Sequence, residues 1–291
     1  MIKRVLTGCL LFIMCYAGLI WLQVFLGRQA QRNDSKNPSV QEPVHKLYSF
    51  SFAKYTPSGE KEIEIEGDSA NILAQTVNLI NVVAKAYAEE TPVTITADRG
   101  NYDKTANKVN LQKNVVATTE NGTRLLTEEL QIHPSKRKMQ TELQAEVKKD
   151  NINVEGTGAI GDSNLKKVKF KKNVTVIIKD PNDKTLPPTV ITCDGPLVVD
   201  YEKNIAYFRK NVVAEDARGK LSADHMDVYY DKATRKVAKI VALHNVVIEN
   251  PDGNKTYSDS VIYLADEGKI ILGGDTEALY FEDETPSGDL F

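Results

Sequence analysis

The sequence has few of the residues that build disulfide frameworks and metal sites. Only three of its 291 residues are cysteines, and Cys9 and Cys15 lie together in one apolar segment near the N-terminus. Cys193 is therefore alone in the rest of the chain, which excludes an internal disulfide framework and a zinc site made from thiolate pairs. The four histidines are scattered, without the close spacing of a metal cluster. We expect no metal site and no cofactor.

Catalytic motifs and an excess of one charge are also missing. The sequence contains no GxSxG, no HExxH and no glycine-rich phosphate loop followed by Lys-Ser or Lys-Thr. The formal net charge of -3, with both signs mixed, offers no electrostatic surface for nucleic acid. We therefore expect no catalytic residues and no nucleic-acid partner. An anchored hydrolase that acts through scattered acids such as Asp98 or Asp224 remains the enzymatic alternative.

One long apolar run stands at the N-terminus. Residues 5–26 contain no charged side chain. As a helix, a run of this length spans roughly 30 Å of hydrocarbon. This predicts a membrane anchor over residues 1–27. A cleaved signal peptide is the alternative, but its apolar region is usually only about 7 to 15 residues long. Residues 6–9 also spell a lipoprotein cleavage box, but the apolar run follows that box instead of preceding it.

The rest of the chain divides by composition. Residues 28–46 are polar and without apolar periodicity, which predicts a flexible tether, and residues 284–291 predict a frayed tail. Between them, apolar and polar residues alternate, as in residues 62–66, 93–97 and 168–170, which is typical of strands. Turn sequences separate these stretches: Pro57-Ser58-Gly59, Glu120-Asn121-Gly122, Pro181-Asn182-Asp183 and Pro251-Asp252-Gly253.

A short phrase recurs through this region. Asn-Val-Val begins at Asn81, Asn114, Asn211 and Asn245, with a near copy at Asn173. Each repeat also contains a small residue followed by an acid: Gly67-Asp68, Ala97-Asp98, Thr127-Glu128, Cys193-Asp194, Ala223-Asp224 and Ser258-Asp259. We interpret the asparagine as a residue that follows a turn, where its side chain can bond nearby backbone and tolerate an unusual conformation, and the acid as a turn or bulge anchor. The small residue allows backbones to approach closely, and Cys193 fits it as small and buried.

Repeats of a few short strands cannot bury their apolar face alone, but stacked neighbours can. The sequence therefore predicts an all-β fold, an elongated twisted sheet built from stacked strand repeats and folded over an apolar interior. The inward residues either pack as core or line a groove for acyl chains, where each buried methylene contributes roughly 0.8 kcal/mol. The candidate groove residues are Ile65, Ile95, Val109, Leu111, Val116, Leu125, Leu130, Ile132, Ile191, Leu221, Met226 and Val228.

The order of anchor, tether and repeats resembles a known family. Residues 95–134 (ITADRGNYDKTANKVNLQKNVVATTENGTRLLTEELQIHP) are similar to LptC, the membrane-anchored periplasmic component of the lipopolysaccharide export bridge. Residues 191–231 and 255–272 resemble the related OstA/LptA-type repeats. The resemblance implies an LptC-like β-jellyroll over residues 47–185 and OstA/LptA-like repeats over residues 186–283, an extension beyond a single-jellyroll LptC.

The same resemblance implies a function. The protein would receive lipopolysaccharide from an inner-membrane ABC transporter, carry its acyl chains in an apolar cleft and pass them to a soluble periplasmic jellyroll. The inner membrane would be crossed by residues 5–26, with the rest in the periplasm. Ala278, Leu279, Tyr280 and Phe281 are the candidate partner edge, although a buried final strand is equally compatible with their sequence. A membrane-tethered structural or adhesive scaffold with a dry core is the alternative function.

Overall fold

The chain folds into a single β-sheet. The structure is a computed structural model that describes residues 45–87, 92–180, 183, 185–234 and 236–280. These residues form one sheet of 16 strands and a short 3₁₀ turn at Pro134–Lys136, so the all-β prediction is confirmed. The predicted membrane helix over residues 5–26 and the tail over 284–291 lie outside the described residues. Within the described ranges, no helix has the length and hydrophobicity to cross a membrane.

The strands have similar lengths, except for two short ones. They are β1 (His45–Tyr55), β2 (Lys61–Ile72), β3 (Thr76–Ala86), β4 (Val93–Asp103), β5 (Lys108–Thr119), β6 (Arg124–His133), β7 (Lys138–Lys149), β8 (Ile152–Asp162), β9 (Lys167–Ile178), β10 (Thr189–Cys193), β11 (Leu197–Asp200), β12 (Ile205–Asp216), β13 (Gly219–Tyr230), β14 (Val237–Glu249), β15 (Lys255–Leu264) and β16 (Lys269–Leu279).

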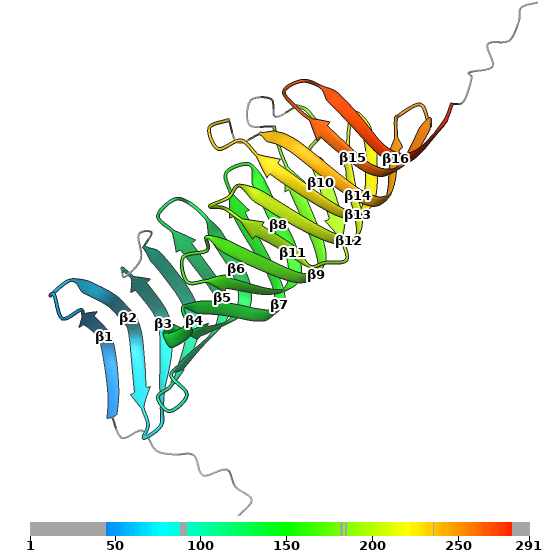
Figure 1. Ribbon diagram of the computed structural model, residues 1–291. Helices are drawn as coiled ribbons and strands as arrows, with labels where there is room; N and C mark the ends of the chain where they lie inside the picture. The colour runs from blue at the N-terminus through cyan, green and yellow to red at the C-terminus, as the bar shows by residue number, and fades with distance from the viewer. Residues whose placement is uncertain (1–44, 88–91, 181–182, 184, 235, 281–291) are drawn as a thin grey trace, which may run out of the picture. The chain divides into compact units, whose positions relative to one another are not determined.

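Strand order in the sheet follows the order of the chain. Each long strand pairs antiparallel with its neighbours in sequence, from β1 at one edge to β16 at the other (Figure 1). The exception is the pair β10 and β11, which both lie between β9 and β12 and together take the place of one long strand. The sheet therefore continues past the predicted boundary between residues 185 and 186, which lies between β9 and β10.

Local sequence explains the strands and their turns. The alternating stretches at residues 62–66, 93–97 and 168–170 all lie in strands, as predicted. Gly59, Gly122 and Gly253 lie in three of the predicted turns and have φ angles of 87°, 85° and 84°, a conformation that favours glycine. The turns end each strand and reverse the chain, which produces the antiparallel order.

A bulge near the middle of many strands bends the sheet. In β12, Lys210 and Asn211 have φ angles of 66° and 49°, and the register to β13 shifts between Arg209 and Val212. The pairs Lys113-Asn114 and His244-Asn245 repeat this conformation in β5 and β14. Bulges of this kind bend a strand. Each bulge, which we call a corner, thus divides its strand into two halves that point in different directions.

The repeated asparagines lie at these corners and bind the repeated acids. The Nδ2 atom of Asn81, Asn114, Asn211 and Asn245 donates a hydrogen bond to the carboxylate of Asp68, Asp98, Asp194 and Asp224, respectively, at 2.6, 2.9, 2.6 and 2.7 Å. Asp68, Asp98, Asp194 and Asp224 are thus bulge anchors, as predicted. The asparagines adopt an unusual conformation, as predicted, with φ angles of 52°, 51°, 49° and 51° at Asn81, Asn114, Asn211 and Asn245. The prediction that they follow a turn and bond nearby backbone was wrong, because they lie within strands and their side chains bind carboxylates on other segments.

The corners divide the sheet into two facing arms. We call arm A the strand halves that include β10 and residues 212–216 of β12, and arm B the halves that include β11 and residues 205–209. Buried side chains of both arms form one hydrophobic cluster from Val93 to Val228. The first valine after each corner asparagine is buried, for example Val115 and Val212, because the bend turns it into this interior.

Candidate functional site

Two continuous apolar rows line the interior, one on each arm. The row on arm A follows the register of the strands from β1 to β16: Phe52, Ile65, Ala84, Ile95, Ala117, Leu125, Val147, Val154, Val176, Ile191, Ala214, Leu221, Ile248, Thr256 and Ala278. The row on arm B runs from β4 to β16: Tyr102, Val109, Ile132, Met139, Gly161, Val168, Val199, Ala206, Val228, Ile240, Tyr263 and Ile270. Neighbouring members are direct cross-strand partners, so the interior is apolar along the sheet.

Burial changes along these rows. In the middle of the sheet the arms pack tightly, and Phe208, Met226 and Val228 are 0% exposed. Toward both edges the same rows open, because Phe52 on β1 is 57% exposed and Ile270 on β16 is 51% exposed. An edge strand has a neighbour on one side only, so its inward side chains lose part of their cover. The rows are thus buried in the middle of the sheet and more exposed near its edges.

A large cavity lies where the arms open near the C-terminal edge. It has a volume of about 740 Å³, and we call it the C-terminal groove. Arm A contributes Ile191, Leu221 and Ile248, whereas arm B contributes Ile240 and Ile270. Burial of an alkyl chain against such a wall gains roughly 0.8 kcal/mol per methylene. The groove can therefore hold acyl chains without a specific polar contact.

Charged residues surround the rim of the C-terminal groove. Arg218 donates hydrogen bonds from Nε to Asp216 Oδ2 at 3.1 Å and from Nη1 to Tyr263 Oη at 3.0 Å. Burial raises the pKa of Asp216, but the hydrogen bonds from Arg218 outweigh burial and hold that pKa below its usual range. Lys220 and Glu249 are cross-strand partners on the same rim. Charged groups thus lie at the mouth of the groove, and apolar ones inside it.

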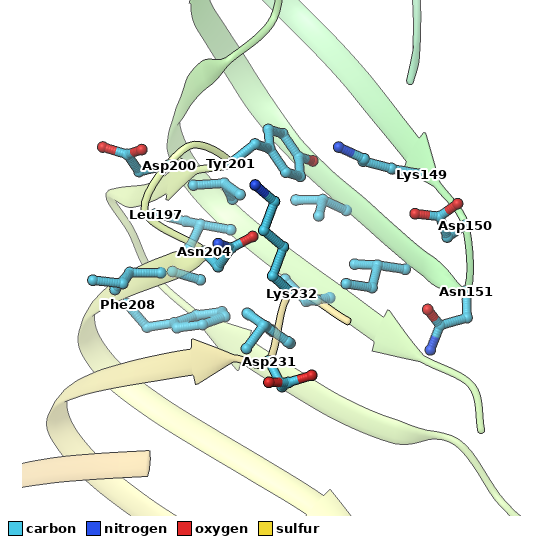
Figure 2. Close-up of a pocket in the computed structure, with 17 residues that line it drawn as sticks. Lys149, Asp150, Asn151, Leu197, Asp200, Tyr201, Asn204, Phe208, Asp231 and Lys232 are labelled. Carbon is cyan, nitrogen blue, oxygen red and sulfur yellow. The ribbon is translucent and has the colours of Figure 1, made fainter. Parts of the chain in front are cut away.

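A smaller cavity of about 200 Å³ lies between the arms beside the first (Figure 2). Its wall includes Leu197 and Phe208, and Lys149, Tyr201 and Lys232 lie around its opening. The Lys149 Nζ atom lies 4.6 Å from the centre of the Tyr201 ring, within the range of a cation–π contact. Burial raises the pKa of Tyr201 to about 12, because the phenolate loses its hydration there.

Most of the predicted groove residues face the interior, but they divide into two groups. The buried members are Ile95, Leu111, Leu125, Leu130, Ile191, Met226 and Val228. The half-buried members are Ile65, Val109, Ile132 and Leu221. Of the whole set, the residues that line the C-terminal groove are Ile191 and Leu221. Whether any of these side chains contacts lipid stays a prediction.

Val116 has a different position from the other candidates. Val115 and Ala117 on either side of it are buried, so the alternation of a strand places Val116 on the opposite face. The valine that faces the interior at this corner is Val115. Ile240 and Ile270 were missed among the groove residues, because both begin continuous apolar runs (residues 240–243 and 270–272) in which alternation does not identify the inward face.

The predicted partner edge is an edge strand. Within the described part of the chain, β16 pairs with β15 only. Ala278 and Leu279 at its end are exposed, as is Tyr280, which follows it, whereas Phe281 lies outside the described residues. Cys193 is buried, as predicted, and burial raises the pKa of its thiol. Among the residues that the structure describes, no three His, Cys, Asp or Glu side chains come together as a metal site.

Sequence comparison identifies the family. The family model described as "Lipopolysaccharide-assembly, LptC-related" matches residues 9–179, more than half of the chain. The match ends one residue after β9, so β10 to β16 continue the sheet beyond it. No curated protein matches the chain. The predicted resemblance to LptC is confirmed, and the chain belongs to the LptC-related family of lipopolysaccharide-assembly proteins.

Proposed function

We propose that this protein binds the acyl chains of lipopolysaccharide between its two arms and passes them along the sheet toward the outer membrane. In this proposal residues 5–26 anchor the chain in the inner membrane, and the sheet lies in the periplasm. An inner-membrane ABC transporter delivers the lipid, because the sequence has no nucleotide-binding motif of its own. A soluble jellyroll protein receives it.

The C-terminal groove is the observation that supports this proposal most directly. Its walls combine aliphatic side chains from both arms, and its charged residues lie at the rim. This distribution suits an amphiphile whose chains are buried and whose polar part stays in water. Family membership in lipopolysaccharide assembly identifies the class of amphiphile.

The exposed edges support the proposed partners. β1 and β16 each have one unpaired side, and an edge strand of this kind can add a strand from another protein. We propose that β16, with Ala278, Leu279 and Tyr280, receives the soluble jellyroll partner and that β1 faces the transporter. The family match ends at residue 179, just after β9, and β10 to β16 extend the sheet beyond it. β16 is therefore the edge at the far end of this extension.

The experiment is site-specific photo-crosslinking in cells that make lipopolysaccharide. A photoreactive amino acid at Ile191 or Leu221 should capture lipid, because both side chains line the C-terminal groove. Thr192 and Ser222 are the matched controls, since each is the next residue along the same strand and points to the opposite face. Equal capture at the groove and control positions would refute the assignment.

The packed centre of the sheet favours the alternative of a structural scaffold. Next to the corners of β12 and β13, the interior is filled by the fully buried side chains of Phe208 and Met226, which belong to one packed hydrophobic cluster. Mass spectrometry of the gently purified protein separates the two functions. Co-purified lipopolysaccharide supports transport, whereas its repeated absence supports a scaffold.

A further inference from the structure

Three cationic side chains of the described residues reach from one arm to the other. Each of these cross-arm contacts lies at the strand ends farthest from the corners. Lys149 on arm A contacts the ring of Tyr201 on arm B, with 4.6 Å from Nζ to the ring centre. Lys236, just before β14 on arm B, has its Nζ 3.9 Å from Asp180 Oδ2, just after β9 on arm A.

The third cross-arm contact spans the mouth of the C-terminal groove. Arg218 lies in the turn between β12 and β13 on arm A, and Tyr263 lies in β15 on arm B. The Arg218 Nη1 atom donates a hydrogen bond to Tyr263 Oη at 3.0 Å, and the guanidinium carbon lies 5.7 Å from the ring centre. Asp216 fixes the other side of the guanidinium through Nε. Both Arg218 and Tyr263 line the groove.

Separating the two arms costs less free energy at the mouth of the groove than at the packed core. Toward the corners, the interior is closed by packed core residues such as Phe208 and Met226. Separating such a core exposes close-packed apolar surface to water or leaves cavities, which is costly. The side of the groove is closed by contacts such as that of Arg218, whose side chain is 71% exposed. Exposed polar contacts contribute little stability, so the side opens more easily than the centre.

We propose that acyl chains enter the C-terminal groove sideways, between the two arms, and that the Arg218–Tyr263 contact is a clasp that opens to admit them. This inference rests on the proposed function, because it specifies how the same groove is filled. Asp216 holds Arg218 in position at the rim while the clasp is open. The Lys236–Asp180 contact closes another point of the same mouth.

The test locks the clasp in the full-length chain. Arg218→Cys and Tyr263→Cys are introduced into a chain whose native cysteines are replaced by serine, and the two thiols are joined with a cleavable bismaleimide. Lipopolysaccharide capture is then measured with a photoreactive amino acid at Leu221. The control pair is Lys220→Cys with Glu249→Cys, which are cross-strand partners on arm A and place the same linker on the same rim without joining the arms.

We expect the locked chain to lose most of its capture at Leu221, and to regain it when the linker is cleaved, while the control pair keeps its capture. Capture by the locked chain equal to that of the unlinked chain would show that the lipid arrives along the interior or past β16, and would overturn the clasp. Loss in the control pair as well, or no recovery after cleavage, would also overturn it. Absence of capture in a chain that has the serine replacements but keeps Arg218 and Tyr263 would instead overturn the proposed function.

Discussion

The corner asparagines offer the sharpest test of what bends the sheet. At Asn211 two effects coincide: the residue has a φ angle of 49°, and its Nδ2 atom donates a 2.6 Å hydrogen bond to Asp194. An ordinary L-residue in this conformation costs roughly 1–2 kcal/mol, because its Cβ approaches the following carbonyl oxygen. An exposed hydrogen bond to a carboxylate contributes about 0.5–1 kcal/mol.

Two substitutions separate the effects. Asn211→Ala removes the hydrogen bond and adds the conformational cost, so we expect a loss of about 2 to 3 kcal/mol in the free energy of unfolding. Asn211→Gly removes only the hydrogen bond, because glycine adopts positive φ without strain, and should lose about 1 kcal/mol. Urea unfolding followed by circular dichroism gives both values as downward shifts of the midpoint.

Asp194→Ala completes the experiment as a double-mutant cycle. If the side-chain bond acts as described, Asn211→Gly in the Asp194→Ala background should cost clearly less than it does alone. Equal losses for alanine and glycine at Asn211 would refute the conformational part of the reasoning. Additive losses in the cycle would refute the part that concerns the hydrogen bond.

Two further predictions concern the interior. Phe208→Ala should lower the free energy of unfolding by about 3–5 kcal/mol because it leaves a cavity in the packed centre, whereas Leu221→Ala at the groove should cost clearly less, which urea unfolding of both variants measures. Tyr201 has a pKa of about 12 in the folded chain against 10.0 for a free tyrosine, so its side chain ionises first in the unfolded chain. The stability that Tyr201 provides is therefore complete below pH 10 and is lost between pH 10 and 12. The loss should be about 3 kcal/mol and should be absent in Tyr201→Phe. An alkaline loss of stability in Tyr201→Phe equal to that of the unchanged chain would contradict the prediction.

The sequence predicts the repeated parts of this fold but not how they pair. Asn-Val-Val and the acids are visible as repeats, and alternation identifies the strands. Their partnership is hidden because the separation varies, with Asn81 and Asp68 being 13 residues apart and Asn245 and Asp224 being 21. Turn lengths differ between repeats, so only the folded register shows that the same two side chains meet at each corner.

Sequence also cannot distinguish a packed interior residue from one that lines a groove. Met226 and Leu221 are apolar, lie in the same strand and face the same interior, yet Met226 is fully buried and Leu221 lines the C-terminal groove. Alternation reports the face of a strand, and both residues satisfy it. The difference comes from the facing arm, which closes over Met226 and stands away from Leu221. That separation is a property of the whole sheet and leaves no signal in either residue's neighbours.

The corners and the cross-arm contacts together determine how the interior can open. At the corners, each arm continues into the other through the backbone, and bonds such as Asn211–Asp194 fix the bend. At the opposite ends of the strands, the arms meet through exposed contacts such as Arg218–Tyr263. A motion that separates the arms therefore breaks the weak contacts first and pivots about the corners. Because backbone hydrogen bonds run between neighbouring strands within each arm, this motion leaves them intact. A lipid can thus be admitted from the side at a lower cost than by displacing Phe208 and its neighbours from the packed centre.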